Sequence, residues 1–374
     1  MEEIEVCIVG GGLAGLTAAL CLAKARIPVL LLEKNSYPNH KVCGEYVSNE
    51  VRPLLEHLGL DISALGVKAI DTLVLSDSNG KCLEAQLPLG GFGISRFALD
   101  QALFERAKAL GVVFRFETVL DIYHKQNGAI LRTTKGEYNA KVVIGAFGKR
   151  ANLDKSMHRP FIQQKSPWLG VKCHYDYPDF PENHVALHTF PGGYGGLSKT
   201  EEGAVNFCYL ANYSSFKAYS NIADYNTSVV SSNPILKEFL SCATPRFERP
   251  LSIAQIAFAG KEAVENHILM CGDSAGLIHP LCGNGMAMAI HAAKLASDCI
   301  VQFFTGPKYD RSHMERQYQD LWKQHFSSRL YYGRQIQALL LRPNITKWTF
   351  SIIANHKKIV QAIVQRTHGK PILV

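Results

Sequence analysis

Glycines close to the N-terminus are spaced so that they can surround a phosphate group. They follow an apolar run of strand type, residues 4–9, and precede a Leu- and Ala-rich helical run, residues 16–25. Glycine permits a tight turn and lets backbone N–H groups approach a pyrophosphate, and a helix N-terminus adds a partial positive charge. The pattern predicts a dinucleotide site formed by Gly10, Gly12, Leu13, Ala14 and Gly15.

An acidic residue ends the next strand of this unit. The apolar run 29–32 leads into Glu33, which lies 18 residues beyond Gly15, and Lys34 follows it. A carboxylate here accepts hydrogen bonds from a ribose diol and disfavours a 2′-phosphate. We therefore expect Glu33 and Lys34 to lie beside the cofactor. The alternative is a glycine-rich turn that only packs a helix against a sheet.

A second glycine segment follows another apolar strand, residues 267–271. Beyond it, a helical run extends from about residue 286 to residue 304. The turn residues between strand and helix are again types that allow the backbone to approach a ligand closely. The candidate cofactor residues of this segment are Gly272, Asp273, Pro280, Gly283, Asn284, Gly285 and Met286.

The two glycine segments, about 260 residues apart, together resemble those of the p-hydroxybenzoate-hydroxylase-like flavoproteins. This superfamily includes aromatic hydroxylases, flavin-dependent halogenases and geranylgeranyl reductases. The resemblance implies FAD as cofactor, with Asp273 on a ribityl hydroxyl and the backbone near Gly283 against the isoalloxazine. The helix from Met286 would point its N-terminus at the flavin N1–C2=O edge, where a helix dipole stabilises the reduced anion. Otherwise, Asp273 is an ordinary helix N-cap.

A third segment supports FAD. Residues 96–103 resemble the R-x-x-L/F-D-x-x-L helix of the same superfamily. The resemblance implies that Arg96 lies against the ribityl and pyrophosphate part of the cofactor. The alternative is a surface arginine paired with Asp100, four residues further along the helix.

One turn that bears on the source of electrons departs from the family pattern. Hydroxylases of the superfamily that use NAD(P)H have Gly-Ala-Asp-Gly after the strand that corresponds to residues 141–144, and Phe147 replaces the Asp here. NAD(P)H is the expected reductant, and a separate flavin reductase is the alternative. Halogenase-like members also lack this Asp, but their Trp-x-Trp-x-Ile-Pro segment has no counterpart, which argues against a halogenase.

Two further segments resemble geranylgeranyl reductases. Residues 41–45 resemble their Lys-x-Cys-Gly stretch near the flavin, which makes Cys43 and Gly44 candidate cofactor contacts. Residues 191–198 resemble the first half of their P-G-G-Y-x-W-x-F-P hairpin, which makes Tyr194 a candidate for the substrate pocket. Cys43 and Tyr194 are our candidate catalytic residues. The alternatives are a small core thiol and a tyrosine that fills the sheet interface.

These motifs predict an α/β protein with a Rossmann-type FAD-binding domain of the glutathione-reductase/p-hydroxybenzoate-hydroxylase type. That domain is expected to be discontinuous, comprising residues 1–70, 92–155 and 260–306. A second, mixed-sheet domain for the substrate, residues 71–91 and 156–259, would be inserted over the flavin, followed by C-terminal helices in residues 307–374. Its expected strands are residues 72–76, 82–87, 169–175, 185–190, 205–210 and 253–257.

The composition excludes several other classes of protein. The chain has 374 residues, of which 47% are hydrophobic, so a full core can form and general disorder is excluded. Ten scattered cysteines without paired Cys or His spacing favour neither a disulfide scaffold nor a metal site, and they are typical of a reducing cytoplasm. An acidic N-terminus does not resemble a signal peptide, so we expect a cytoplasmic protein.

The C-terminal segment carries the excess positive charge of the chain. Residues 307–374 contain twelve Lys and Arg but three Asp and Glu, and no acid follows Asp320. One reading is a helical layer with a solvated basic face, and the other is peripheral contact with an anionic membrane. Nucleic acid is not an expected partner, because no nucleic-acid-binding motif accompanies the charge. The expected apolar face comprises Trp348, Phe350, Ile352, Ile353, Ile359, Val360, Ile363 and Val364.

The sequence thus indicates an FAD-dependent oxidoreductase with an apolar small-molecule substrate. Our first hypothesis is a monooxygenase that hydroxylates or oxidises a polyketide, aromatic or prenyl-lipid-like substrate. The second is a geranylgeranyl-reductase-like enzyme that saturates C=C bonds, in which Cys43 donates or orients a proton. The third is a flavoprotein that depends on an external reductase. The sequence contains no hydrolytic constellation, so the chemistry must come from the cofactor.

Overall fold

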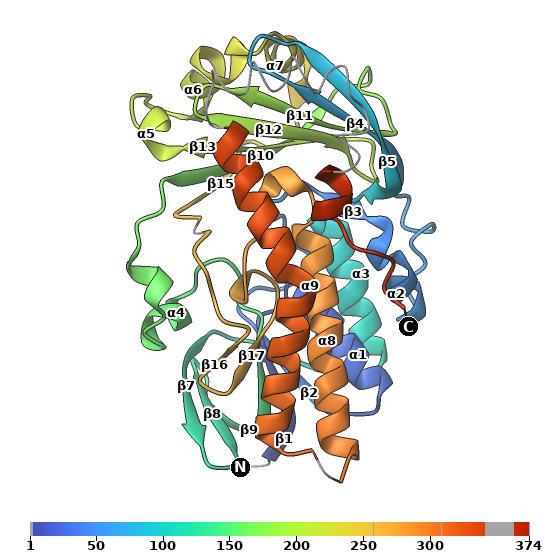
Figure 1. Cartoon of the computed structure of the whole chain (residues 1–374), viewed down its shortest axis with the longest axis vertical. Helices are drawn as coiled ribbons and strands as arrows, with labels where there is room; N and C mark the ends of the chain where they lie inside the picture. Colours follow the sequence, from blue (N-terminus) through green and yellow to red (C-terminus); the bar gives the residue numbers. More distant parts are fainter. Residues whose placement is uncertain (1–2, 257, 308, 341–362, 374) are drawn as a thin grey trace.

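The chain folds into two sheets joined by a layer of long helices (Figure 1). The computed structural model describes all residues except 1–2, 257, 308, 341–362 and 374. One sheet and its helices make the lower part of the molecule in Figure 1, and the second sheet lies across the top. The long α9, Arg311–Leu340, runs beside α8, Gly285–Thr305, and reaches from the lower part to the upper sheet.

The first sheet has a parallel core with the order β17-β9-β1-β2-β6. Carboxyl ends of parallel strands meet at one edge, so the turns after β1, β2, β9 and β17 gather there, where α/β sheets bind their ligands. A hairpin, β7 and β8, and the short β16 complete the sheet. The strands are β1 Glu3–Val9, β2 Val29–Glu33, β6 Val113–Phe116, β7 Val119–Lys125, β8 Gly128–Thr133, β9 Glu137–Gly145, β16 Val264–Glu265 and β17 Ile268–Met270.

The helices that cover this sheet are apolar where they meet. α1, Leu13–Lys24, is buried along most of its length because it packs against both α3, Arg96–Ala109, and α8. Small residues dominate α1 and the first half of α8, and this permits the close approach of the two helices. This packing fixes the glycine turn at the start of α1 next to the start of α8. The remaining α-helices are α2 Arg52–His57, α4 Asn152–Ser156, α5 Tyr213–Phe216, α6 Ile222–Ser228 and α7 Pro234–Cys242.

The second sheet is mixed and has the order β14-β10-β13-β12-β11-β4-β5-β3, with β15 also paired to β10. Helices α5, α6 and α7 lie on its outer side in Figure 1. Its strands are β3 Tyr46–Ser48, β4 Lys68–Ser76, β5 Cys82–Gly93, β10 Trp168–Asp176, β11 His184–Phe190, β12 Gly193–Lys199, β13 Val205–Asn212, β14 Thr244–Pro245 and β15 Leu251–Ala254. Short 3-10 helices span Asn49–Val51, Pro160–Gln163, Val230–Ser232, Gly272–Ser274 and Pro280–Cys282.

The predicted fold class is confirmed, and strand pairing runs across two of the expected domain boundaries, near residues 70 and 92. We expected residues 1–70 to lie wholly in the cofactor domain. Instead β3 pairs with β5 and the start of β4 also pairs with β5, so both belong to the second sheet. The physical reason is that β5 is longer than expected and its far end, Gly91–Gly93, offers free backbone groups that β3 satisfies.

The last described residues return to the cofactor side of the molecule. Residues 363–367 are helical, and the Ile372 amide donates to the carbonyl oxygen of Glu50 at 2.8 Å. Of the expected apolar C-terminal face, only Ile363 and Val364 belong to the described residues, and Val364 is buried. The other members of that face lie outside them. None of the described helices combines the length and the hydropathy that crossing a bilayer requires.

Candidate flavin site

The turn after β1 requires glycine at two of its three motif positions. Gly10 has φ +103°, and a Cβ atom there would collide with the carbonyl of Ala146. A Cβ atom on Gly15 would collide with the carbonyl oxygen of Gly10. These two glycines are therefore explained by packing of the turn and the helix, with no ligand needed.

Gly12 is different, because a Cβ atom there would collide with nothing and would meet two cationic side chains at ordinary contact distance. A Cβ atom on Gly12 would lie 3.7 Å from the Arg96 guanidinium and 3.9 Å from Lys41 Nζ. No described side chain caps the N-terminus of α1, so the first N–H groups of the helix are available to a ligand. Free amides, a helix dipole and two cations around an open face fit a pyrophosphate, and therefore fit the dinucleotide that the sequence predicts.

Arg96 and Lys41 share one buried carboxylate. Arg96 donates from Nε and Nη2 to Asp100 at 2.8 and 2.9 Å, and Lys41 Nζ lies 2.9 Å from Asp100 Oδ2. Burial alone would raise the pKa of Asp100, but the two cations outweigh burial and hold that pKa below its usual range. Arg96 is thus paired with Asp100 and also lies beside Gly12. One carboxylate facing two cations leaves a net positive charge for a phosphate.

Glu33 lies at the end of β2, beside the same turn. Its carboxylate accepts from the Gly11 amide at 2.6 Å and from the Asn35 amide at 3.1 Å. Tyr37 donates to the carbonyl oxygen of Gly11 at 2.7 Å, so both faces of Gly11 are held. Lys34 is exposed at this edge. Contact of Glu33 and Lys34 with a ribose stays a prediction.

The second glycine segment packs directly on the first. Gly272 has φ +61°, and a Cβ atom there would lie 3.1 Å from the Cβ of Ala14. Lys261 Nζ donates to the carbonyl oxygens of Asp273, at 2.7 Å, and Lys149, at 2.9 Å. It also lies 4.2 Å from the centre of the Phe161 ring, and burial lowers its pKa to about 8. Lys261 therefore ties the Asp273 turn to the turn that follows β9.

The loop before α8 contains a buried amide group with an unsatisfied oxygen. Asn284 is fully buried and donates to the Thr367 carbonyl oxygen at 2.8 Å, while its Oδ1 has no hydrogen-bond partner within the described part of the chain. Gly283 has φ +61°, and a Cβ atom there would lie 3.2 Å from the Tyr46 ring. α8 begins at Gly285, Met286 is buried and Pro280 is exposed. A free acceptor at a helix N-terminus is consistent with a polar ring at this position.

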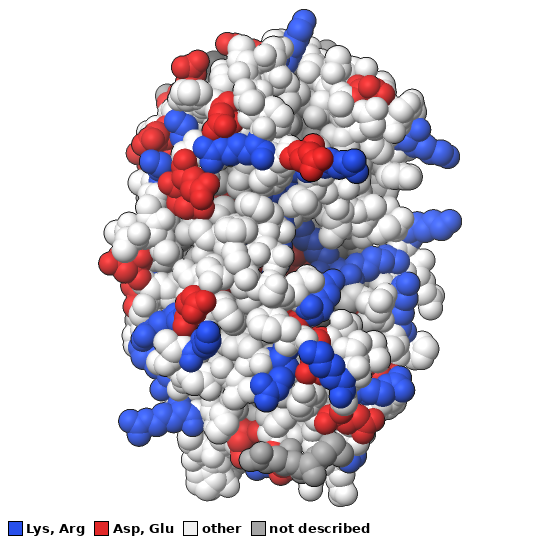
Figure 2. All heavy atoms as spheres, turned by 180° about the vertical axis from the view of Figure 1, so that it is seen from behind, with Lys and Arg blue, Asp and Glu red and all other residues white. Residues whose placement is uncertain are grey.

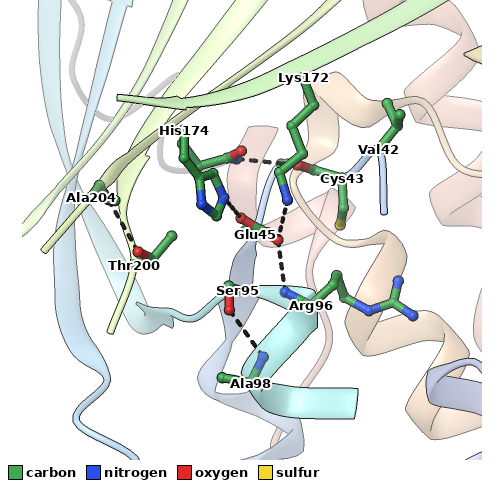
Figure 3. A network of polar contacts seen from close by, with 12 residues as sticks. Val42, Cys43, Glu45, Ser95, Arg96, Ala98, Lys172, His174, Thr200 and Ala204 are labelled. Carbon is green, nitrogen blue, oxygen red and sulfur yellow. Dashed lines mark hydrogen bonds and ion pairs between the residues drawn. The ribbon is translucent and has the colours of Figure 1, made fainter. Parts of the chain in front are cut away.

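Cys43 and Gly44 lie under the second sheet, where the sequence places the flavin edge. Asn206 of β13 donates to the Cys43 carbonyl oxygen at 3.1 Å, and Ser198 of β12 donates to the Gly44 carbonyl oxygen at 3.2 Å. Cys43 is half-buried, and Figure 3 shows its sulfur on the side of the loop that faces Arg96. The sheet therefore holds the backbone of this loop at two points and leaves the thiol free of a covalent partner.

Tyr194 lies on the same face of the sheet as this loop. It is four residues from Ser198 on β12, so both side chains point to the same side. Tyr194 is buried in an apolar cluster with Trp168, Leu210, Ile256 and Leu277. Leu277 lies within the second glycine segment, directly after Gly276, so the cluster forms an apolar wall between the sheet and the cofactor loops. Such a wall suits an apolar substrate.

Three charged or titratable side chains that the sequence did not single out meet beside Gly44. Glu45 accepts from Lys172 Nζ at 2.5 Å, from the Arg96 amide at 2.7 Å, and contacts His174 Nε2 at 2.6 Å. Figure 3 shows the Glu45 carboxylate between Lys172, His174 and the start of α3. Burial alone would raise the pKa of Glu45, but His174 and Lys172 hold it below its usual range. The only sequence signal was the isolated Lys172 in the apolar run of β10.

Seen from behind, Lys and Arg side chains border a hollow near the middle of the molecule (Figure 2). The turn after β9 also contributes basic residues, Lys149 and Arg150, but no acid. Phe147 is half-buried against the core at the position where NAD(P)H-using relatives have Asp. The described residues of this turn thus offer no carboxylate to a nicotinamide nucleotide.

Comparison with known proteins identifies the family of the chain. The family model described as "FAD binding domain" matches residues 3–311. "Conditioned medium factor receptor 1" of Dictyostelium discoideum is 23% identical over 351 residues, covering 86% of this chain and 68% of the relative. "Digeranylgeranylglycerophospholipid reductase" of Methanosarcina acetivorans is 26% identical over 352 residues, covering 87% and 82%.

Two solved structures share the fold over nearly the whole chain. A flavoprotein/dehydrogenase from Cytophaga hutchinsonii superimposes with a TM-score of 0.78 at 17% identity, covering 98% of this chain and 93% of that one. A geranylgeranyl bacteriochlorophyll reductase-like protein from Thermoplasma acidophilum superimposes with a TM-score of 0.76 at 18% identity, covering 98% and 97%.

Proposed function

The chain belongs to the FAD-binding-domain family, within the p-hydroxybenzoate-hydroxylase-like flavoproteins, and from that premise we propose that it saturates C=C bonds of a prenyl lipid, as the geranylgeranyl-reductase-like branch does. It is an FAD-dependent oxidoreductase. The observation that carries the finer proposal is the position of Cys43. Asn206 holds its backbone from the sheet face that also carries Tyr194. Bound FAD would supply the two electrons that each saturation requires.

The residues of the chain have separate tasks in this proposal. Arg96, Lys41 and the start of α1 bind the pyrophosphate, and Asp273 and Asn284 hold the flavin end of the cofactor. Cys43 donates or orients the proton that completes saturation, and the Tyr194 wall excludes water from the reacting bond. The curated relative from Methanosarcina, which acts on a digeranylgeranyl lipid by its name, supports this substrate class.

A cavity next to this site has room for part of a prenyl chain. It measures about 710 Å³, and Tyr46, whose ring faces Gly283, forms part of its lining. Pockets of this size commonly bind small molecules. Its lining combines apolar side chains, among them Leu87, Leu295, Val364 and Ile372, with charged ones, Lys294, Asp298, Arg329 and Lys370. We propose that the chain of the substrate extends into this cavity.

A second candidate is the monooxygenase, and one observation favours it. Gly196 and Ser198 replace the Trp and Phe of the reductase hairpin, and Ser198 is used to hold the Gly44 carbonyl. That half of the reductase motif is therefore missing from the apolar wall. A hydroxylase acting on an aromatic or polyketide substrate would not need it.

One experiment separates the two functions. The FAD-loaded protein is reduced with dithionite without oxygen, and a geranylgeranyl lipid is added. The reductase should reoxidise its flavin and add two hydrogens for each saturated bond, as measured by mass spectrometry. An oxygenated product that forms only when oxygen is admitted would support the monooxygenase instead. Cys43→Ala should slow saturation, and Cys82→Ala, which changes an exposed thiol on β5, is the matched control.

The reductant is also part of the proposal. We propose NAD(P)H as the electron source, and Phe147 is the residue that argues for a separate flavin reductase. Bleaching of the bound flavin by NADH or NADPH in the absence of substrate tests direct reduction. A flavin that only dithionite or an added reductase can bleach assigns the electrons to a partner protein.

A further inference from the structure

A buried ion pair connects the second sheet to the loop beside the candidate flavin. Glu45 and Lys172 are both completely buried, and their charged atoms are 2.5 Å apart. His174, two residues along β10 from Lys172, is 5% exposed and contacts the other oxygen of the same carboxylate. Figure 3 shows that Lys172 and His174 descend from the sheet while Glu45 rises from the loop.

The backbone of Glu45 indicates that the carboxylate is held in place by its contacts. Its φ is +56°, a conformation that residues with a side chain seldom adopt. Its carboxylate makes three polar contacts, and its own carbonyl oxygen accepts from the Ile94 amide at 3.1 Å. An uncommon backbone conformation stabilised by so many contacts is typical of functional sites.

The charges around this loop are divided between two carboxylates. Asp100 forms ion pairs with Arg96 and Lys41, next to the glycine turn. Glu45 forms an ion pair with Lys172, under the sheet. The remaining neighbours of Glu45 are His174 and, beyond it, His40, whose ring lies 5.2 Å from that of His174. Lys172 is thus the one fully buried Lys or Arg among these residues, and Glu45 is its counterion.

The ion pair is close to the position where the isoalloxazine is expected. Glu45 follows Cys43 and Gly44 directly, and the same sheet face that carries Lys172 holds both of their carbonyl groups. Charges act over longer distances in a buried, low-dielectric region than in water. A fixed charge at this position must therefore act on a flavin that gains electrons.

We propose that Glu45 and Lys172 together set the reduction potential of the bound flavin. Lys172 stabilises the reduced, anionic flavin, and Glu45 limits that stabilisation while it fixes the Cys43–Gly44 loop. His174 is the positioning residue that orients the carboxylate. This inference rests on FAD binding and not on the identity of the substrate, so it holds for either candidate reaction.

The test is the midpoint potential of FAD bound to Glu45→Gln and Lys172→Met variants, measured against reference dyes. Glu45→Gln leaves Lys172 without its counterion and should shift the potential to more positive values. Lys172→Met removes the cation and should shift it to more negative values. Asp77→Asn is the matched control, since it neutralises a buried carboxylate in the β4–β5 turn and should leave the potential unchanged.

Shifts of the midpoint potential in opposite directions in the two variants distinguish this role from a purely structural one. If both variants bind FAD and their potentials are unchanged, or shift in the same direction, the proposal is wrong. The double variant should recover thermal stability lost by either single variant, because no buried charge is then left unpaired. Its potential should lie between those of the single variants.

A second pair of variants covers the case in which Glu45→Gln does not fold. Lys172→Arg keeps the positive charge and should keep the potential, while Lys172→Gln should lower it. Equal potentials in these two variants would refute a charge effect. Failure of lipid turnover in a wild-type protein that binds FAD would contradict the proposed reaction only, since the potentials are measured without substrate.

Discussion

Gly12 and Arg96 face each other across the opening of the turn that follows β1. The side chain that Gly12 lacks would extend towards the Arg96 guanidinium, with 3.7 Å between the new Cβ and the nearest nitrogen. Gly15, three residues away, instead packs against the Gly10 carbonyl. The two glycines of one motif therefore differ: Gly15 must be glycine to make room for the backbone, whereas at Gly12 no described atom excludes a side chain, and we expect the bound cofactor to do so.

This difference predicts opposite effects of alanine at the two positions. Gly12→Ala should leave the unfolding of the FAD-free protein nearly unchanged and weaken FAD binding about tenfold, or ~1.4 kcal/mol. Gly15→Ala should destabilise the FAD-free protein itself, by about 3 kcal/mol or more, because backbone atoms must move. Thermal melts without FAD and fluorescence titration with FAD separate the two effects. Equal melting temperatures for both variants would contradict this assignment.

Asp100 should give the protein part of its sensitivity to acid. The pKa of Asp100 is below its usual range in the folded protein, because Arg96 and Lys41 outweigh burial. Its contribution to stability is therefore complete above the ordinary carboxyl pKa and is lost as the pH falls through the folded-state pKa. Asp100→Asn should lower the free energy of unfolding by about 3–5 kcal/mol near neutral pH. It should also flatten the fall in stability at acid pH, the acid limb of the stability curve. Urea unfolding at several pH values measures both, and an unchanged acid limb would contradict the prediction.

Lys261 should produce a slope of the same sign on the alkaline side, where stability again rises with pH. Burial lowers its pKa from 10.5 to about 8 in the folded protein. Between these values the unfolded chain binds a proton that the folded chain does not, so stability should rise with pH over this window. Lys261→Met should remove that rise, and comparison of the two proteins cancels the titration of other groups. Melting temperatures in buffers across the window provide the measurement. The same slope in both proteins would show that Lys261 keeps its proton.

Filling the cavity beside Tyr46 should weaken binding of a long prenyl lipid and leave FAD binding unchanged. Leu295 is buried on α8 and lines this cavity of about 710 Å³. Leu295→Trp should raise the KM for a long prenyl lipid several-fold, since the larger ring occupies space for the chain. FAD affinity and turnover of a short-chain analogue should stay near wild type. Equal effects on long and short substrates would place the chain elsewhere.

Peripheral membrane contact through residues 307–374 is a further prediction, based on the charge of the segment. Twelve Lys and Arg against three acids should bind anionic vesicles by an attraction that salt screens. The full chain should sediment with vesicles that contain an anionic phospholipid at low ionic strength and be released at high ionic strength. Vesicles of neutral phosphatidylcholine are the control. A chain that stays in the supernatant with anionic vesicles at low salt would end this proposal.

The sequence alone determined the parts of the protein that depend on local backbone geometry. Glycine turns after strands, a helix close behind them and the acid at Glu33 can be recognised within a few residues, because turn and helix formation follow local rules. The helix was expected from residue 16 and begins at Leu13. Pairing of β3 with β5 crosses the expected boundary at residue 70, and local sequence could not predict it because it joins residues more than forty positions apart.

Only the tertiary structure decided which charges meet. Glu45 and Lys172 are 127 residues apart, and nothing in either local sequence specifies the other as its partner. In the sequence, Lys172 is a single lysine within an apolar strand. Its partner becomes apparent only when the sheet is placed over the loop that carries Glu45. The same holds for Lys261, whose two carbonyl partners come from separate turns. Burial forces such groups to find partners, but the fold, through its long-range packing, determines which partners are within reach.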